Sequence, residues 1–71
     1  MDKEIFLLGD PVVYRDDIKG FDDLGIVVQT GSLHVLWNNE HQHRVEIYER
    51  LRLARLDEVD AHCRIIKKGA A

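Results

Sequence analysis

The chain has 71 residues, which is enough for one small folded domain and too few for an active-site cleft between two domains. Its residues are 45% hydrophobic and 32% charged, a globular balance that excludes a wholly disordered tail. Ten Lys and Arg against thirteen Asp and Glu give a formal net charge of -3, which removes the general electrostatic reason to expect non-specific binding to nucleic acid.

The first strand is predicted to begin at Pro11. A Gly-Asp turn signal precedes this proline, and the apolar Val12 and Val13 follow it. Residues 15–23 then carry four aspartates and a glycine without a sustained period. This pattern indicates a loop, the longest irregular stretch of the chain.

A β-hairpin is predicted within residues 24–37, because Gly31-Ser32 lies in the middle of an apolar run. Glycine followed by serine is typical of a two-residue type II′ turn, and such a turn fixes the pairing of the strands beside it. The pairs on the predicted buried face are Thr30 with Leu33, Val28 with Val35, and Ile26 with Trp37. The pairs on the opposite face are Gln29 with His34 and Val27 with Leu36.

A third strand is predicted after the polar turn at 38–41, because His43, Val45 and Ile47 alternate with more polar residues. If the loop centres on residue 40, Val45 lies opposite Val35 and continues the buried face together with Ile47. Leucines and arginines alternate in the following residues 49–56. This run fits either a short final strand or a single helical turn followed by a strand.

A short helix is predicted at about residues 57–68. Asp57 with Asp60 resembles a weak N-terminal cap, and apolar residues from Val59 to Ile66 recur at helical spacing. An extended second half of this segment is the alternative that the pattern leaves open. The sequence thus predicts one domain over residues 1–71.

Short antiparallel strands joined by tight turns cannot all bury one face in a flat sheet, so a mainly β sandwich or small barrel is predicted. The segments that carry a family resemblance are GDPVVY at 9–14, LGIVV at 24–28, VLW at 35–37 and ERL at 49–51. Their order resembles the SH3-like barrels of the Tudor and KOW type, including the Tudor-like modules of bacterial transcription and repair factors. The resemblance implies a small antiparallel barrel at about residues 9–56. The acidic loop after the first strand and the added C-terminal segment, predicted above as a short helix, depart from the family pattern. The resemblance also implies a non-enzymatic adaptor that binds a protein partner, RNA polymerase or nucleic acid.

The single cysteine, Cys63, cannot form an internal disulfide, so the packed core must supply the stability. This is expected in a reducing compartment. The apolar runs are only a few residues long, too short for a secretory signal or a membrane span. We therefore predict a cytoplasmic protein, bacterial or phage-encoded, without a membrane segment.

Four histidines invite a metal hypothesis. His41 and His43 would point to one side of a strand, and His34 could approach from the neighbouring strand. No carboxylate or cysteine is positioned to complete a closed shell, and His62 next to Cys63 has poor geometry for a nucleophile and its base. The sequence also lacks a Gly-rich phosphate loop and a nucleophile elbow. We therefore predict no metal site, no cofactor and no catalytic residue.

A partner-binding surface is predicted around the acidic loop. In Tudor-like barrels, aromatic residues on the open side can form a ligand groove, and Phe21 lacks a packing pattern around it, as expected of an exposed anchor. Trp37 is assigned to the core instead. The residues predicted to bind a protein partner are Tyr14, Asp16, Asp17, Phe21, Asp22, Asp23 and Tyr48.

An alternative function follows from the uneven distribution of charge. Residues 1–32 carry seven acids and three bases, whereas residues 33–71 carry six acids and seven bases. A basic patch in the second half would contact the phosphates of nucleic acid. Its predicted members are Arg50, Arg52, Arg55, Lys67 and Lys68. The sequence leaves open whether the protein is a monomer or a homodimer.

Overall fold

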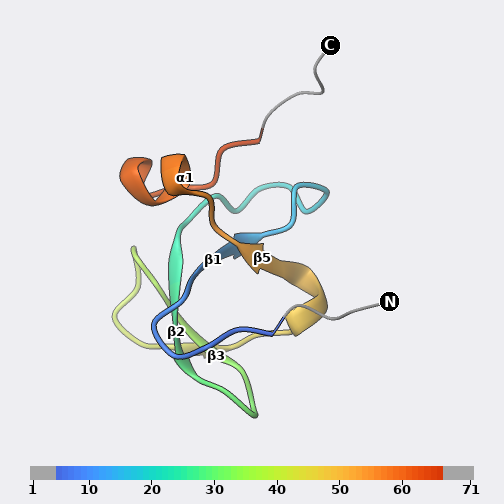
Figure 1. Ribbon diagram of the computed structural model, residues 1–71, viewed down its shortest axis with the longest axis vertical. Coiled ribbons are helices and arrows are strands. Elements are labelled where there is room, and N and C mark those ends of the chain that lie inside the picture. Colours follow the sequence, from blue (N-terminus) through green and yellow to red (C-terminus); the bar gives the residue numbers. More distant parts are fainter. Residues whose placement is uncertain (1–4, 67–71) are drawn as a thin grey trace.

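The computed structural model describes residues 5–66 and has a mainly antiparallel β architecture with one short helix (Figure 1). The strands are β1 (Pro11–Tyr14), β2 (Gly25–Gln29), β3 (His34–Trp37), β4 (Arg44–Val45) and β5 (Leu51–Leu53). A 3-10 turn, η1, spans Tyr48–Arg50, and the helix α1 spans Leu56–Ala61. This confirms the predicted mainly β fold with a short helix after it.

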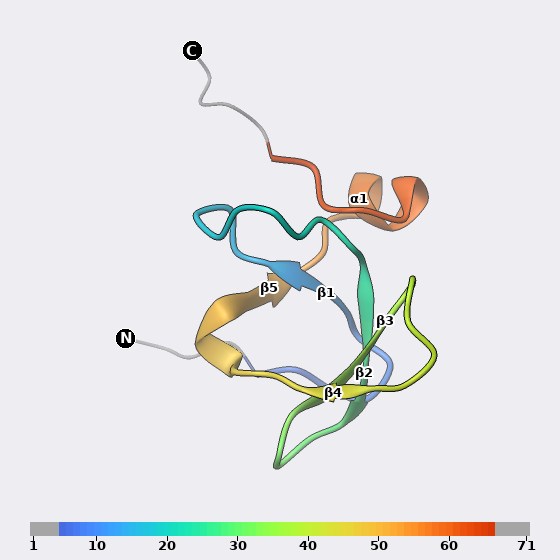
Figure 2. The same cartoon turned by 180° about the vertical axis from the view of Figure 1, so that it is seen from behind.

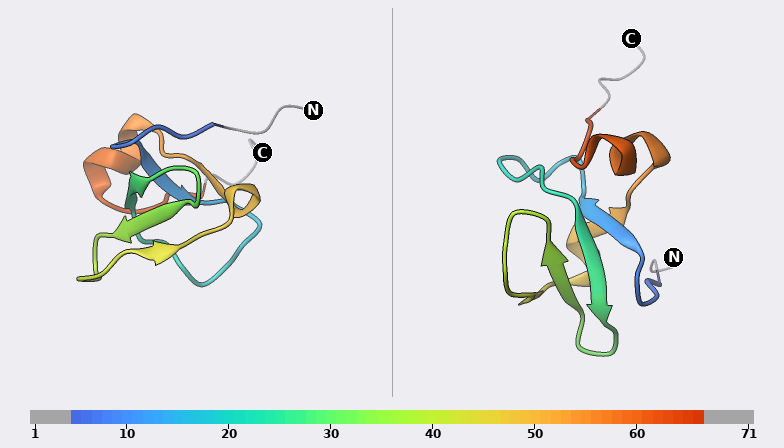
Figure 3. Two further views of the ribbon diagram at one scale, coloured as in Figure 1. Left: turned by 90° about the horizontal axis from the view of Figure 1, so that it is seen from below. Right: turned by 90° about the vertical axis from the view of Figure 1, so that its left-hand side faces the viewer.

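The five strands form one sheet in the order β4-β3-β2-β1-β5. Among these strands β4 and β5 are the two edges, and no ladder joins them, so the sheet is open. The short link through η1 carries the chain from one edge to the other (Figure 2). The strands therefore wrap around the interior instead of lying flat, and α1 covers one end (Figures 1 and 3).

One cluster of buried side chains fills the interior. Its members are Phe6, Val12, Val27, Leu33, Val35, Trp37 and Leu51. Phe6 reaches this cluster from the segment before β1 and stacks on Tyr48, with ring centroids 5.6 Å apart and planes inclined by 6°. Each large side chain buried here contributes roughly 1.5–3 kcal/mol to the free energy of folding.

The first strand and the loop after it lie where the sequence places them. β1 begins at Pro11, a position at a strand start where proline costs no ladder hydrogen bond. Residues 15–23 hold no helix or named strand, apart from an isolated bridge between Asp23 and Cys63. Both predictions are confirmed.

A hairpin turn lies at its predicted place, but it spans four residues where a two-residue turn was predicted. Gln29 pairs with His34, and residues 30–33 form the turn between them. Gly31 has a φ of 91°, a left-handed conformation that glycine adopts without steric cost. Glycine at this position therefore allows the chain to reverse.

A bulge at Val28 makes the predicted register wrong beyond the turn. The ladder shifts between Val27 and Gln29, so β2 holds one residue more than β3 at this point. Val27 pairs with Val35 and is buried, whereas Ile26 and Val28 are each 40% exposed. Because one inserted residue exchanges the two faces of a strand, the predicted buried face of β2 lies outside.

Trp37 is fully buried, as predicted, but it pairs with Gly25 and not with Ile26. A Cβ atom on Gly25 would lie 2.6 Å from Cε3 and 2.9 Å from Cζ3 of the indole. Real Cβ atoms do not approach other atoms so closely, so glycine is needed to accommodate the ring. The shifted register therefore matches the one small residue of β2 to the largest side chain of the core.

The predicted register of the third strand is wrong as well. Arg44 pairs with Val35, where Val45 was expected, because the loop before β4 extends to residue 43. Val45 and Ile47 are 65% and 51% exposed. The side chain of Glu46 is only 8% exposed. The carboxylate of Glu46 thus points into the interior, whereas Val45 and Ile47 on either side of it, which were predicted to be buried, point outward.

The C-terminal segment decides between the alternatives of the sequence. A helical turn followed by a strand, η1 and β5, occupies 48–53. The helix α1 begins one residue earlier than predicted, at Leu56, and it is shorter than predicted. It ends at Ala61 because His62 adopts a left-handed conformation with a φ of 60°. Residues 64–66 are not helical, so the predicted helix is wrong there, and 67–68 lie outside the described residues. The alternative of an extended segment from Ala61 is not met at its start either, because Ala61 belongs to α1.

Candidate functional site

Three aromatic rings from distant parts of the chain meet at one place. Tyr14 and Phe21 lie 5.0 Å apart between ring centroids, and Trp37 lies 5.2 Å from Tyr14 and 5.0 Å from Phe21. Such tilted and edge-to-face arrangements are favourable because ring edges meet ring faces. Phe21 is therefore partly buried, where the sequence predicted an exposed anchor.

Side chains of β4 and its neighbour fill the open side of this aromatic cluster. Glu46 accepts hydrogen bonds from the hydroxyl of Tyr14 and from Nε1 of Trp37, both at 2.9 Å. The guanidinium carbon of Arg44 lies 5.3 Å from the Phe21 ring centroid, within cation–π distance. Burial, and then the bond to Glu46, raise the pKa of Tyr14 above 10.0. The aromatic groove predicted from the sequence is thus occupied by residues of the same chain.

The acidic loop is held in place by Arg64. This side chain is 1% exposed and donates hydrogen bonds to the carbonyl oxygens of Arg15 at 2.7 Å and Ile18 at 2.6 Å. It also donates to the Oδ1 atom of Asp22 at 2.7 Å, and its backbone N–H bonds to the Asp22 carbonyl at 2.6 Å. A single buried guanidinium therefore satisfies both the charge and the backbone of the loop.

A second ion-pair network joins the loop to α1. Arg52 donates to both carboxylate oxygens of Glu58, at 2.8 and 2.7 Å, and to Asp16 at 2.7 Å. Glu58 is fully buried. Burial alone would raise the pKa of Glu58, but hydrogen bonds from Arg52 and from the backbone N–H groups of Arg55 and Ile65 outweigh this effect and lower it from 4.5 to about 2.

The predicted partner-binding residues have different environments. Tyr14 and Phe21 lie together, Asp16 and Asp22 form the ion pairs described above, and Tyr48 stacks on Phe6. Two further acids of the loop complete the set: Asp17 is exposed, and Asp23 accepts a hydrogen bond from Asn39 at 2.9 Å.

The predicted basic patch is dispersed. Arg52 and Arg55 contact Glu58, with Arg55 at 3.6 Å, and Arg55 also donates to the carbonyl of Ile65 at 2.7 Å. Arg50 is exposed, and Lys67 and Lys68 lie outside the described residues. Two of the three described arginines of this set therefore serve intramolecular ion pairs.

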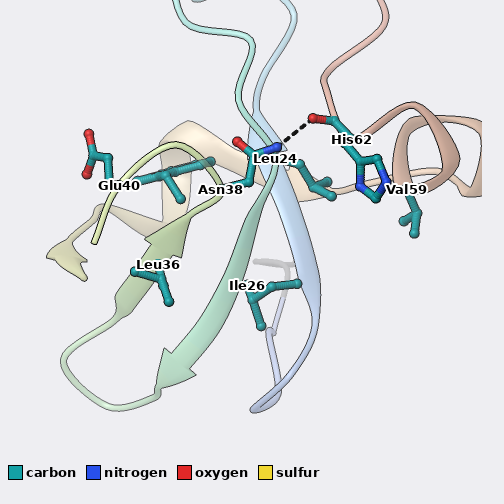
Figure 4. A pocket seen from close by; sticks show the side chains of 8 residues that line it. Leu24, Ile26, Leu36, Asn38, Glu40, Val59 and His62 are labelled. Atoms are coloured by element: carbon teal, nitrogen blue, oxygen red, sulfur yellow. Dashed lines mark hydrogen bonds between the residues drawn. The ribbon is translucent and has the colours of Figure 1, made fainter. Parts of the chain in front are cut away.

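A hollow of about 400 Å³ opens between the outer face of the β2–β3 hairpin and α1 (Figure 4). Its lining residues are Leu24, Ile26, Leu36, Trp37, Asn38, Glu40, Val59 and His62. Ile26 and Leu36 are paired across β2 and β3 and are 40% and 36% exposed. The floor of the hollow is therefore an apolar pair on the solvent side of the sheet.

The polar residues at the rim of the hollow are bonded to other parts of the chain. The side-chain amide of Asn38 donates to the carbonyl oxygen of His62 at 2.7 Å (Figure 4). Glu40 forms an ion pair with Arg44 at 3.1 Å. The lining includes one carboxylate and neither Lys nor Arg. The hollow thus offers an apolar surface with an acidic edge.

Sequence reasoning did not find this hollow because the bulge at Val28 cannot be read from the residues. Every position from Gly25 to Val28 is small or apolar, so no alternation separates the inner from the outer face. The one weak indication of the hollow in the sequence was Leu36, an apolar residue on the face predicted to lie outside.

Within the described range 5–66, no helix has the length and apolar character needed to cross a membrane.

Comparisons with protein-family models, curated proteins and solved structures gave no significant match.

Proposed function

We propose that this protein is a non-enzymatic interaction module of the SH3-like barrel type, and that it binds a protein partner through the hollow between the β2–β3 hairpin and α1. The strand order supports this barrel type, because the last strand returns beside the first and a short link joins the two sheet edges. The observation that supports partner binding is the hollow itself.

The chemistry of the hollow favours a partner that contributes apolar side chains. Ile26 and Leu36 form an exposed apolar pair, and the buried Leu24 and the half-buried Val59 line the hollow beside it. Contiguous exposed apolar surface is typical of protein interaction sites. A small polar ligand is less suited, because the amide of Asn38 already donates within the chain and offers little directional recognition.

The charge around the hollow favours a partner with basic residues beside its apolar ones. Glu40 lies on the rim, and Asp23 bonds to Asn39, next to the rim residue Asn38. The exposed Asp17 belongs to the same acidic loop. Attraction between this edge and Lys or Arg of a partner would speed association and orient the bound segment. Of the predicted acidic surface, Asp23 thus lies next to the edge of the hollow, where it accepts the hydrogen bond from Asn39.

The test replaces the two apolar residues at the floor of the hollow by threonine, a polar residue that also favours β-strands. A variant with Ile26→Thr and Leu36→Thr should lose most of its binding to the partner isolated with the parent protein, with affinity at least about tenfold lower, because buried apolar contacts are removed. The partner is captured from native extract with nuclease present and identified. Affinity is then measured by calorimetry with the purified proteins.

A matched control is Val45→Thr, which removes an apolar residue that is 65% exposed on the edge strand β4. This variant should bind as the parent does. Asp17→Lys should slow association several-fold at low salt and less at high salt. Unchanged affinity in the Ile26 and Leu36 variant would refute the assignment of the hollow, provided that its melting temperature shows it to be folded.

The nucleic-acid alternative has no comparable support among the described residues. Arg52 and Arg55 are tied to Glu58, which leaves Arg50 as the exposed member of the predicted set in this range. Loss of all captured material after nuclease treatment would reverse this ranking.

A further inference from the structure

Two histidines from neighbouring strands meet at the surface. Nδ1 of His34 lies 3.0 Å from Nδ1 of His43, with ring centroids 4.9 Å apart. His34 is in β3, and His43 immediately precedes β4, its ladder partner. The contact therefore exists because the sheet forms.

The sheet holds both rings at their places. His34 pairs with Gln29 on one side and with Val45 on the other. The backbone N–H of Glu46 also donates to the carbonyl oxygen of Leu33 at 2.9 Å, which extends the β3–β4 connection beyond the ladder. Since the backbone is fixed, only rotation of the side chains is needed to adjust the two nitrogens.

The separation of the two nitrogens matches a pair of metal ligands. Imidazole nitrogen binds a divalent transition metal ion such as zinc at a distance of about 2.0–2.1 Å. Two nitrogens 3.0 Å apart then subtend an angle of about 95° at the metal. This angle is near that of adjacent ligands in the square or tetragonal geometry of Cu²⁺ and Ni²⁺, and narrower than the tetrahedral angle preferred by Zn²⁺.

We propose that His34 and His43 form a two-point binding site for Cu²⁺ or Ni²⁺ on the surface of the β3–β4 pair. In the free protein the two Nδ1 atoms share a hydrogen bond, so one of them carries a proton. Metal binding displaces this proton from Nδ1, and both rings then bind through Nδ1 with their proton on Nε2. No group of three or more His, Cys, Asp or Glu side chains suited to a metal ion occurs among residues 5–66, so water completes the coordination. The site is therefore open to a further ligand. Copper binds more tightly than nickel, as the general order of divalent affinities requires.

The main competitor is a local chelate of His41 and His43, two residues apart in the sequence, which would need no folded sheet. Matched variants of the full-length protein separate the two. His34→Gln removes a ligand of the proposed site and leaves the local chelate intact. His41→Gln does the reverse. Both substitutions replace one imidazole by a side chain of similar length.

The experiment titrates each protein with CuSO₄ in a non-coordinating buffer and measures affinity by competition with a chromophoric chelator. His34→Gln and His43→Gln should each lower Cu²⁺ affinity by at least about tenfold, whereas His41→Gln should change it less than about twofold. Electron paramagnetic resonance of the parent complex should show two coordinated imidazole nitrogens, and of the His34→Gln complex fewer. Copper should also raise the melting temperature of the parent and not of His34→Gln, because binding requires the folded sheet.

Parent-like affinity of His34→Gln would overturn the proposal, and so would a loss in His41→Gln equal to that in His34→Gln. Each result would assign copper to the local chelate or to other groups. The melting temperature without metal shows whether His34→Gln is folded. Where it is not, His41→Gln and His43→Gln decide together: a loss of affinity in His43→Gln alone supports the proposal, and an equal loss in both overturns it. None of these outcomes depends on the partner proposed above.

Discussion

Single arginine side chains fix segments that sequence analysis left without structure. Arg64 binds the backbone of the acidic loop, and Arg52 connects that loop to the buried carboxylate of Glu58. In the sequence, Arg52 counts only as a member of a basic patch. In the structure its side chain is half-buried and pairs with the buried Glu58, and the hydrogen bonds to Glu58 raise the pKa of Arg52. Removing one partner of such a pair is costly because the other charge stays buried.

The substitution Glu58→Gln should lower the free energy of unfolding by roughly 3 kcal/mol at neutral pH. The folded pKa of Glu58, about 2, is below the ordinary value of 4.5, so its contribution is fully present above about pH 5. The contribution is lost as the pH falls through the folded value. Urea unfolding at several pH values should therefore show the parent and the variant converging toward pH 2.

The matched control is Asp60→Asn, which changes an exposed carboxylate on the same helix α1. It should alter the free energy of unfolding by less than about 0.5 kcal/mol. A constant difference between parent and Glu58→Gln from pH 7 to pH 2 would contradict the assigned protonation behaviour.

At the scale of elements, the loop and the C-terminal segment act as one unit. Arg64 reaches the carbonyl oxygens of Arg15 and Ile18, and Cys63 forms a bridge with Asp23. The segment after α1 is therefore the structural support of the loop. A helix continued past Ala61 would carry Arg64 away from these oxygens, which is a physical reason for the early helix end.

We expect Arg64→Lys to loosen the loop, because a lysine ammonium cannot reproduce the planar fork that contacts four groups at once. The amide of Ile18, which donates to the carbonyl oxygen of Arg15 at 3.0 Å, should exchange with deuterium at least about tenfold faster. Hydrogen-exchange mass spectrometry measures this directly. Arg50→Lys, at an exposed arginine, is the control and should leave the loop unchanged. Equal protection in both variants would show that the loop is held by other contacts.

The sequence predicted elements better than the faces that they bury. The turn at Gly31, the start of β1 and the long loop follow from local chemistry of glycine, proline and aspartate, and they are confirmed. The bulge at Val28 depends on packing of Trp37 against Gly25, a contact between strands that no local pattern contains. The error at this one residue is the reason why the hollow was missed.

The buried orientation of the Glu46 side chain was also predicted wrongly because it depends on contacts between strands. An alternating pattern assigns Val45 and Ile47 to the core and Glu46 to solvent. The reverse arrangement is stable because Tyr14 and Trp37 both donate hydrogen bonds to this carboxylate. These donors come from other strands, so the preference cannot be recognised from β4 alone. Tyr14 and Phe21 of the predicted groove do lie together, but Tyr48 stacks on Phe6 instead. The enclosure of the aromatic cluster by Glu46 and Arg44 was not predicted.

At the scale of the whole molecule, four of the five strands, all except β4, contribute side chains to one small core. Phe6, outside the sheet, is 1% exposed and belongs to the same cluster as Trp37 and Leu51. A domain of this size has a total stability of roughly 4–10 kcal/mol. The loss of one large core side chain therefore affects every element at once.

Phe6→Ala should cost about 3–5 kcal/mol and leave a large fraction of the molecules unfolded near 37 °C. Its urea transition should move to much lower concentration by both circular dichroism and fluorescence. Leu7→Ala, at a residue that is 65% exposed, should keep the parent transition. If Phe6→Ala unfolded like the parent, the N-terminal segment would not be a part of the core.

The environment of Trp37 gives this molecule a built-in optical probe. It is the chain's single tryptophan, it is fully buried, and its indole N–H donates to Glu46 while two other rings lie within about 5 Å, Tyr14 at 5.2 Å and Phe21 at 5.0 Å. Excitation energy absorbed by Tyr14 is transferred efficiently to this indole at such a separation. The emission colour of one residue therefore reports whether β1, β3, the acidic loop and the segment of Glu46 are assembled together.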